Sequence, residues 1–122
     1  MSSTLDVMRE PRQASARVND PPVLILTSLA SGPKHGYALM QDIEGFSGVR
    51  LGPGSLYGAI SRLEERGLIE PLGAVSRTRP YQLTSAGRQA LEATIAGLRA
   101  VVDEATTRLA PPPQAALAGG DA

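Results

Sequence analysis

The sequence predicts a mainly α-helical fold with one small β-hairpin and a long helix near its C-terminal end. Apolar residues recur at three- and four-residue spacing in the stretches 35–46, 53–66 and 84–110, which is the spacing of amphipathic helices. Two short stretches with aliphatic and aromatic residues, 68–72 and 79–83, flank a polar turn, as in a hairpin. A chain of 122 residues is long enough for one domain with a modest core.

The composition divides the chain into four parts. We expect residues 1–19 to form a flexible arm, because they hold few apolar residues. Residues 111–122 are rich in Pro, Ala and Gly, so we expect a disordered tail. Between these ends, residues 20–84 should form the folded domain, and residues 85–110 should form a helix for dimerisation.

Local signals mark the ends of the predicted elements. Asp20 followed by proline predicts the start of a short buried helix. The third helix should open with Pro53 and end at Gly67. Pro80 cannot donate to a β-ladder, so its strand should begin there or lie at an edge. Thr84 is a suitable N-cap for the last helix. The order helix, helix, helix, hairpin, long helix is that of a winged helix-turn-helix with a dimerisation helix appended.

The last helix has an apolar stripe with a period of 3.5 residues, which is typical of helix pairing. The stripe covers fewer than three heptads, and Gly97 interrupts the helix, so other elements must contribute to a dimer. The alternative is an amphipathic helix that packs on its own domain. The residues assigned to dimerisation are Leu91, Ile95, Leu98, Val102, Ala105 and Leu109.

The third helix has an outer face that suits the major groove of DNA. With Leu56, Ile60 and Leu63 turned to the core, a step of ~100° per residue leaves polar and small residues outside. Serine and arginine can bond to base edges or phosphates, and a glycine allows the backbone to approach DNA closely. Glu65 weighs mildly against this face. The remaining outer residues are Ser55, Gly58, Ser61 and Arg62, with Tyr57 on the flank.

The charge distribution favours the same part of the chain. The formal net charge is zero, but residues 49–88 hold six arginines and three glutamates, a local excess of three positive charges. Arg77 and Arg79 flank the hairpin turn, where a wing would cross the phosphate backbone. An arginine-rich face that is simply solvated would explain the excess about as well.

Catalysis, metal binding and membrane insertion have little support in the sequence. One histidine and no cysteine provide none of the common nucleophile–base pairs or multi-histidine metal sites. We therefore expect no enzyme activity, no metal and no cofactor. No apolar run reaches the ~18 residues that span a bilayer, and the first 20 residues lack a signal-peptide core, so we expect a cytoplasmic protein.

Three segments resemble, in the same order, the PadR family of bacterial transcriptional regulators. They are GPKHGYALMQDIE, GPGSLYGAISRLEERGLIE and RPYQLTSAGRQAL, and the resemblance spans about Val23 to Leu91. The short, single C-terminal helix resembles the smaller subgroup of this family. The resemblance implies a homodimer, generally a repressor, that binds double-stranded DNA at a palindromic operator and lies on the bacterial nucleoid when bound. It also implies release by a small-molecule effector.

The resemblance also implies roles for single residues. Its HGY motif corresponds to His35, Gly36 and Tyr37, and its SLY motif includes Tyr57, which we expect to contact DNA. Lys34, His35 and Tyr37 are expected to contact the DNA backbone from the start of the second helix. Pro80 stands where the family more usually has an aromatic or basic residue, so wing contacts are less secure than helix contacts. Zero net charge keeps one alternative open, a winged helix that binds other proteins as an adaptor.

Overall fold

A computed structural model describes residues 19–73 and 79–112. Within them the elements are α2 (Pro21–Leu29), α3 (Gly36–Ser47), α4 (Pro53–Glu65), β1 (Ile69–Pro71), β2 (Tyr81–Leu83) and α5 (Ser85–Leu109). This order confirms the predicted fold class. The chain divides into two compact units, Met1–Glu92 and Ala93–Ala122, so the first unit holds every element except most of α5.

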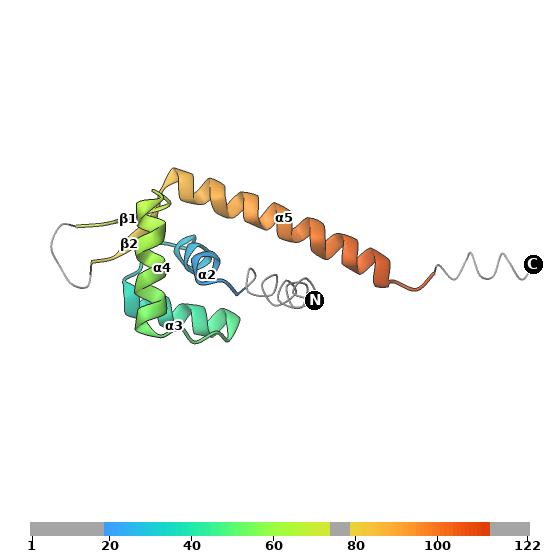
Figure 1. Ribbon diagram of the computed structural model, residues 1–122, viewed down its shortest axis with the longest axis horizontal. Coiled ribbons are helices and arrows are strands. Elements are labelled where there is room, and N and C mark those ends of the chain that lie inside the picture. Colours follow the sequence, from blue (N-terminus) through green and yellow to red (C-terminus); the bar gives the residue numbers. More distant parts are fainter. Residues whose placement is uncertain (1–18, 74–78, 113–122) are drawn as a thin grey trace, which may run out of the picture. The chain divides into compact units, whose positions relative to one another are not determined.

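The first unit has one hydrophobic core, to which α2, α3 and α4 all contribute (Figure 1). α2 packs against both α3 and α4. α3 and α4 place aliphatic side chains toward this centre because their apolar residues recur every three or four positions, whereas α2 contributes a continuous apolar run, of which Leu24, Ile25 and Leu26 are buried. The largest fully buried apolar side chains are Ile25, Leu39, Ile43, Leu56, Ile60, Leu63 and Ile69.

α4 ends in a tight turn that leads directly into β1. Gly67 adopts a left-handed conformation with φ 75°, which costs glycine little because it has no Cβ. The N–H of Leu68 donates to the carbonyl of Leu63 over 3.0 Å, and the N–H of Gly67 donates to that of Glu64 over 2.9 Å. These two bonds form a Schellman motif, and they confirm Gly67 as the predicted end of the third helix.

The two strands form an antiparallel hairpin that is shorter than predicted. Ile69 pairs with Leu83, and Pro71 pairs with Tyr81. Pro80 lies just before β2, where its carbonyl accepts a bond from the N–H of Leu72, so the missing N–H of proline costs no ladder bond. The predicted strands 68–72 and 79–83 are therefore too long by one or two residues at their ends. The turn at residues 74–78 lies outside the described residues.

A short pairing that the sequence did not predict extends this sheet. Lys34, in the connection between α2 and α3, forms a bridge with Tyr81. The N–H of Lys34 donates to the Tyr81 carbonyl over 3.1 Å, and the N–H of Tyr81 donates to the Lys34 carbonyl over 2.9 Å. The connection between the helices therefore occupies the free edge of β2.

The start of α5 is held against the end of α4. The hydroxyl of Thr84 donates to the Gly67 carbonyl over 2.6 Å and accepts from the N–H of Gly87 over 3.0 Å. The N–H of Thr84 donates to the Leu68 carbonyl. Thr84 is thus the N-cap of α5, as the sequence predicts. Gly87 lies against Leu68 so closely that a Cβ atom would overlap the Leu68 carbonyl oxygen.

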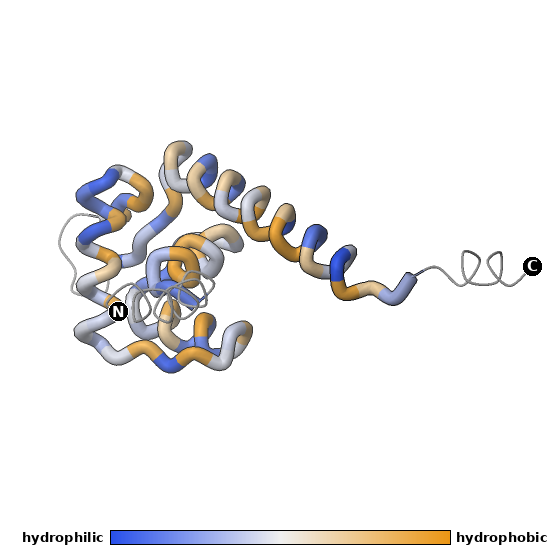
Figure 2. Tube along the Cα trace, turned by 45° about the vertical axis from the view of Figure 1, so that its right-hand side comes forward, coloured by the Kyte–Doolittle hydropathy of each residue, from blue (hydrophilic) through white to orange (hydrophobic). Residues whose placement is uncertain are grey.

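α5 has two different environments along its length. Leu91 is 8% exposed and belongs to the core of the first unit, so its assignment to the dimer stripe was wrong. Farther along, Val102 is 59% exposed and Leu109 is 84% exposed. Hydrophobic residues recur along this part of the helix in Figure 2. In residues 19–73 and 79–112, no helix is both long enough and apolar enough to cross a membrane.

The close contact at Gly87 predicts a large effect of a small substitution. Gly87→Ala should lower the free energy of unfolding by about 1–3 kcal/mol, because the new methyl group meets backbone that cannot move aside easily. Gly97→Ala is the matched control in the same helix, since no atom lies within 4 Å of a Cβ built there. It should raise stability by about 0.5–1 kcal/mol. Urea denaturation at one fixed protomer concentration measures both, and equal effects of the two variants would contradict this interpretation.

Candidate nucleic-acid interface

The outward face of α4 carries the polar side chains that the sequence assigns to it. Leu56, Ala59, Ile60 and Leu63 are buried, and this fixes which side of the helix remains outside. Ser55, Ser61 and Arg62 are exposed there, whereas Gly58 is half-buried. The result is a convex polar surface on a rigid helix.

Gly58 leaves space for the side chain of Arg62. A Cβ atom built at Gly58 would lie 3.6 Å from Nη1 of Arg62. The guanidinium therefore extends along the helix toward its N-terminal end, which is the usual direction for long side chains on a helix. Arg62 can donate several N–H groups from the middle of the exposed face, and a guanidinium suits bidentate binding to guanine or phosphate.

Tyr57 packs against the start of α3. Its hydroxyl and ring lie over Gly36, where a Cβ atom would overlap the Tyr57 hydroxyl and lie 2.8 Å from Cζ. Tyr57 nevertheless stays 47% exposed. One edge of the ring therefore fixes α4 on α3, while the other edge borders the polar face of α4. The HGY and SLY motifs are coupled here, because the glycine of one makes room for the tyrosine of the other.

The start of α3 presents two exposed side chains beside this contact. His35 is the N-cap residue, and its side chain is exposed. Tyr37 is 62% exposed, and its hydroxyl accepts a hydrogen bond from Nε2 of Gln41 over 3.2 Å. The structure therefore leaves both His35 and Tyr37 accessible at the end of α3 that meets Tyr57.

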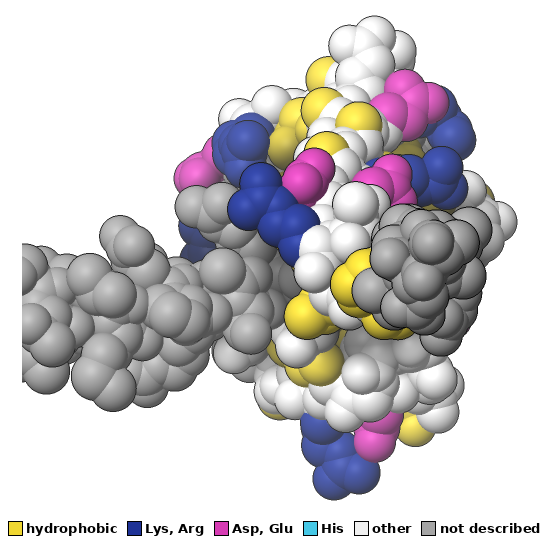
Figure 3. Space-filling model, turned by 90° about the vertical axis from the view of Figure 1, so that its right-hand side faces the viewer, with side chains coloured by type: hydrophobic (Ala, Val, Ile, Leu, Met, Phe, Trp, Pro, Cys, Tyr) yellow, Lys and Arg dark blue, Asp and Glu magenta, His cyan; other side chains and the backbone are white. Residues whose placement is uncertain are grey.

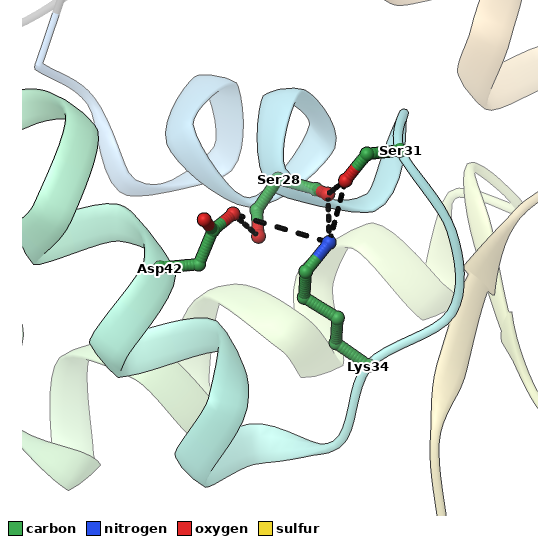
Figure 4. Close-up of polar contacts among 4 residues, drawn as sticks. All are labelled: Ser28, Ser31, Lys34 and Asp42. Carbon is green, nitrogen blue, oxygen red and sulfur yellow. Dashed lines mark hydrogen bonds and ion pairs between the residues drawn. The ribbon is translucent and has the colours of Figure 1, made fainter.

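Lys34 is less exposed than His35 and Tyr37, and its assignment as a DNA-backbone contact stays a prediction. Its ammonium donates to the Ser28 carbonyl over 2.5 Å and to Oγ of Ser31 over 2.8 Å (Figure 4). It also lies 3.9 Å from Oδ2 of Asp42. A lysine has three donors, and two of them are used in hydrogen bonds within the protein.

The wing can be described only in part. Arg77 belongs to residues 74–78, which lie outside the described residues. The guanidinium of Arg79 lies over the ring of Tyr81, with Cζ 5.9 Å from the ring centroid, so it has a weak cation–π contact. Arg79 remains partly exposed just before β2.

The charged side chains do not form a surface of one sign. On the face shown in Figure 3, acidic and basic side chains are interspersed. Arg50, before α4, donates to Oε2 of Glu44 over 3.0 Å, so one arginine of the locally basic segment is already paired. Within the described residues, no three His, Asp or Glu side chains come together as a metal site.

The coupling of Gly36 and Tyr57 can be tested by a double-mutant cycle. Gly36→Ala should cost about 1–3 kcal/mol of unfolding free energy, because the methyl group displaces the Tyr57 ring. In a Tyr57→Ala background the same change should cost nothing. Gly45→Ala is the control within α3, since no atom lies within 4 Å of its built Cβ. An equal cost of Gly36→Ala in both backgrounds would show that the two residues are independent.

Comparison with known proteins connects this arrangement to a family. The model of the transcriptional regulator PadR-like family matches residues 25–93. A solved PadR family transcription regulator from Clostridium difficile R20291 has a TM-score of 0.65 and 23% identity, over 74% of this chain and 98% of that chain. A solved PadR-like transcriptional regulator from Bacillus cereus has a TM-score of 0.68 and 20% identity, over 80% and 99% of the two chains.

A relative of higher identity is a much larger protein. An uncharacterized 37.1 kDa protein in transposon TN4556 of Streptomyces fradiae is 57% identical over 76 residues. The match includes 62% of this chain, which spans only 22% of that protein. At 20–23% identity the solved structures show a shared fold. The family model matches more than half of the 122 residues, so the chain belongs to the PadR-like family of transcriptional regulators.

Proposed function

We propose that this regulator binds double-stranded DNA by inserting α4 into the major groove. The observation that carries the proposal is the exposed polar face of α4, on which Ser55, Ser61 and Arg62 remain accessible while the opposite face is buried. A helix of this width fits the major groove, where each base pair presents a distinct set of donors and acceptors. Gly58 adds no side chain that would hold the backbone away from the bases.

The contacts of this face divide into two kinds. Arg62 is the candidate for reading a base, because its guanidinium extends along the exposed face beside Gly58 and can bond to guanine through two N–H groups. Ser55, in the first turn of α4, lies where unpaired backbone N–H groups favour a phosphate. Such phosphate contacts set the position of the protein, and base contacts set its sequence preference.

Residues around α4 extend the proposed interface. Tyr57 borders the polar face with its exposed edge, and His35 and Tyr37 lie at the start of α3. These three side chains would contact the DNA backbone on one side of the recognition helix. Arg79, with Arg77 of the wing turn, would contact it on the other side.

A second copy of the chain is the proposed partner of α5. The residues of the stripe beyond Leu91 are Ile95, Leu98, Val102, Ala105 and Leu109, and four of these five are exposed. An apolar stripe of this period gains stability when a second helix covers it. A two-fold dimer would place two recognition helices ~34–36 Å apart on a palindromic site, and a dimer that occupies a promoter would repress it. Release by a small-molecule effector remains a prediction from the family resemblance.

The role of Arg62 predicts a change in sequence discrimination. Duplexes selected from a random library by the wild-type protein supply the binding site, and a scrambled duplex of the same composition supplies the reference. Arg62→Ala should reduce discrimination at one base pair by about 1–3 kcal/mol. Arg108→Ala, which removes an exposed arginine paired only with Glu104 in the described residues, is the control and should leave discrimination unchanged. Unchanged affinity and salt dependence in Arg62→Ala would contradict the assignment.

The same selection separates the proposal from the adaptor alternative. A regulator that binds DNA should enrich one family of sequences and should bind more tightly at low salt, where the electrostatic contribution is largest. A protein-binding adaptor would enrich no sequence even at low salt. That outcome would remove the proposed function.

The role of α5 predicts a change in oligomeric state. Val102→Asp should raise the dimer dissociation constant about 100-fold or more, because burying an unpaired carboxylate in each protomer costs several kcal/mol. Ala100→Asp adds the same charge two residues away, about 160° around the helix, and should leave the dimer intact. Sedimentation equilibrium measures both constants. A dimer that tolerates Val102→Asp as well as Ala100→Asp would place the contact elsewhere.

A further inference from the structure

The cluster of polar side chains between α2 and α3 has no part in the proposed DNA contacts. Its members are Ser28, Ser31, Lys34 and Asp42 (Figure 4). Ser28 is 2% exposed and donates its hydroxyl to Oδ2 of Asp42 over 2.5 Å. This bond joins the last turn of α2 directly to the middle of α3.

The ammonium of Lys34 places a positive charge beside the hydrogen bond between Ser28 and Asp42. This ammonium binds the Ser28 carbonyl at the C-terminal end of α2, where backbone carbonyls lack helical partners and favour a cation. The same ammonium lies 3.9 Å from the Asp42 carboxylate. The lysine side chain is 20% exposed and that of Asp42 is 40% exposed, so water screens this ion pair only in part. One side chain therefore touches both α2 and α3.

The backbone of Lys34 makes a connection in a different direction. Its N–H and carbonyl both pair with Tyr81, the first residue of β2. The ammonium thus fixes the residue to two helices, and the main chain fixes it to the wing strand. Both sets of contacts belong to one residue, so Lys34 joins two helices to the edge of the sheet.

We propose that Lys34 is a positioning residue of the DNA-binding unit, which sets the placement of α3 and of the wing strand relative to α2. This inference rests on the proposed function. Without the ammonium, the Asp42 carboxylate loses its cation and the end of α2 loses a donor, so α3 and β2 can shift with respect to the core. The residues of α3 and of the wing then no longer reach the DNA in the position that α4 requires. The preference of the protein for one DNA sequence therefore falls.

Lys34 is the single lysine of the sequence, which provides a test without DNA. Protein labelled with ¹⁵N-lysine has one side-chain ammonium to observe by NMR. We expect that signal to exchange slowly with water because its protons are held in hydrogen bonds. Asp42→Asn should speed this exchange and also the exchange of the Lys34 amide, which donates to the Tyr81 carbonyl. An ammonium that exchanges as fast as free lysine in the wild-type protein would overturn the proposal.

The second test measures DNA binding by Lys34→Met, Lys34→Arg and Asp42→Asn at a temperature well below unfolding of each variant. The probes are the selected duplex and the scrambled duplex. Lys34→Met and Asp42→Asn should each lower the ratio of the two affinities about tenfold, within the range of coupled sites. Neither should change the slope of affinity against salt. Lys34→Arg should keep the ratio of affinities close to that of the wild-type protein, because a guanidinium can donate to the same acceptors.

The outcomes separate positioning from a direct contact. If Lys34 binds a phosphate, Lys34→Met will weaken both duplexes equally and reduce the salt slope by about 0.9, and Asp42→Asn will have no effect. Lower stability with an unchanged affinity ratio would mean a purely structural role, and it would overturn the proposal. A wild-type protein that selects no DNA would remove the proposed function, and this would be visible before any variant is made.

Discussion

Backbone carbonyls at the end of α4 determine where the neighbouring elements of the first unit lie. The carbonyls of Gly67 and Leu68 lie just beyond the end of α4 and accept no bond from within that helix. Here Thr84 supplies donors to both Gly67 and Leu68. Four parts of the chain therefore meet at one point. They are the end of α4, the start of β1, the end of β2 and the start of α5. Gly87 permits this meeting, because any larger residue would fill the space that the Leu68 carbonyl occupies.

The wing strand is fixed at both of its ends. A two-stranded hairpin is marginally stable by itself, and β2 has only three residues. Thr84 holds its far end against the turn after α4, while Lys34 pairs with Tyr81 at its near end. The strand is thus joined to two different helix connections. Its direction follows from the packing of the helices, and this allows a short wing to keep a defined orientation next to α4.

Local signals explain which parts of this arrangement the sequence predicts. Pro53, Gly67 and Thr84 act on the helix ends within a few residues, so the order of elements follows from them. The outer face of α4 follows from the spacing of its apolar residues. The roles of Lys34 and Leu91 do not follow, because they depend on contacts between segments that are distant along the chain. A lysine near the start of a helix fits a phosphate contact equally well from sequence alone. The contacts of its ammonium with Asp42 and with the end of α2 become visible only in the structure.

If the regulator binds DNA as proposed, its selectivity must depend on geometry more than on charge. The chain has no net charge, and acidic and basic side chains are interspersed on the face shown in Figure 3. Non-specific DNA affinity depends almost wholly on neutralised phosphates, and Lys34, Arg50 and Arg108 already have acceptors within the protein. Directional contacts such as that proposed for Arg62 then supply a larger share of binding, and their energy falls steeply when the donor is displaced. Internal contacts at Lys34 and Thr84, which touch no DNA in the proposed complex, would therefore limit how well the protein distinguishes one sequence from another, as would the packing of Tyr57 on Gly36.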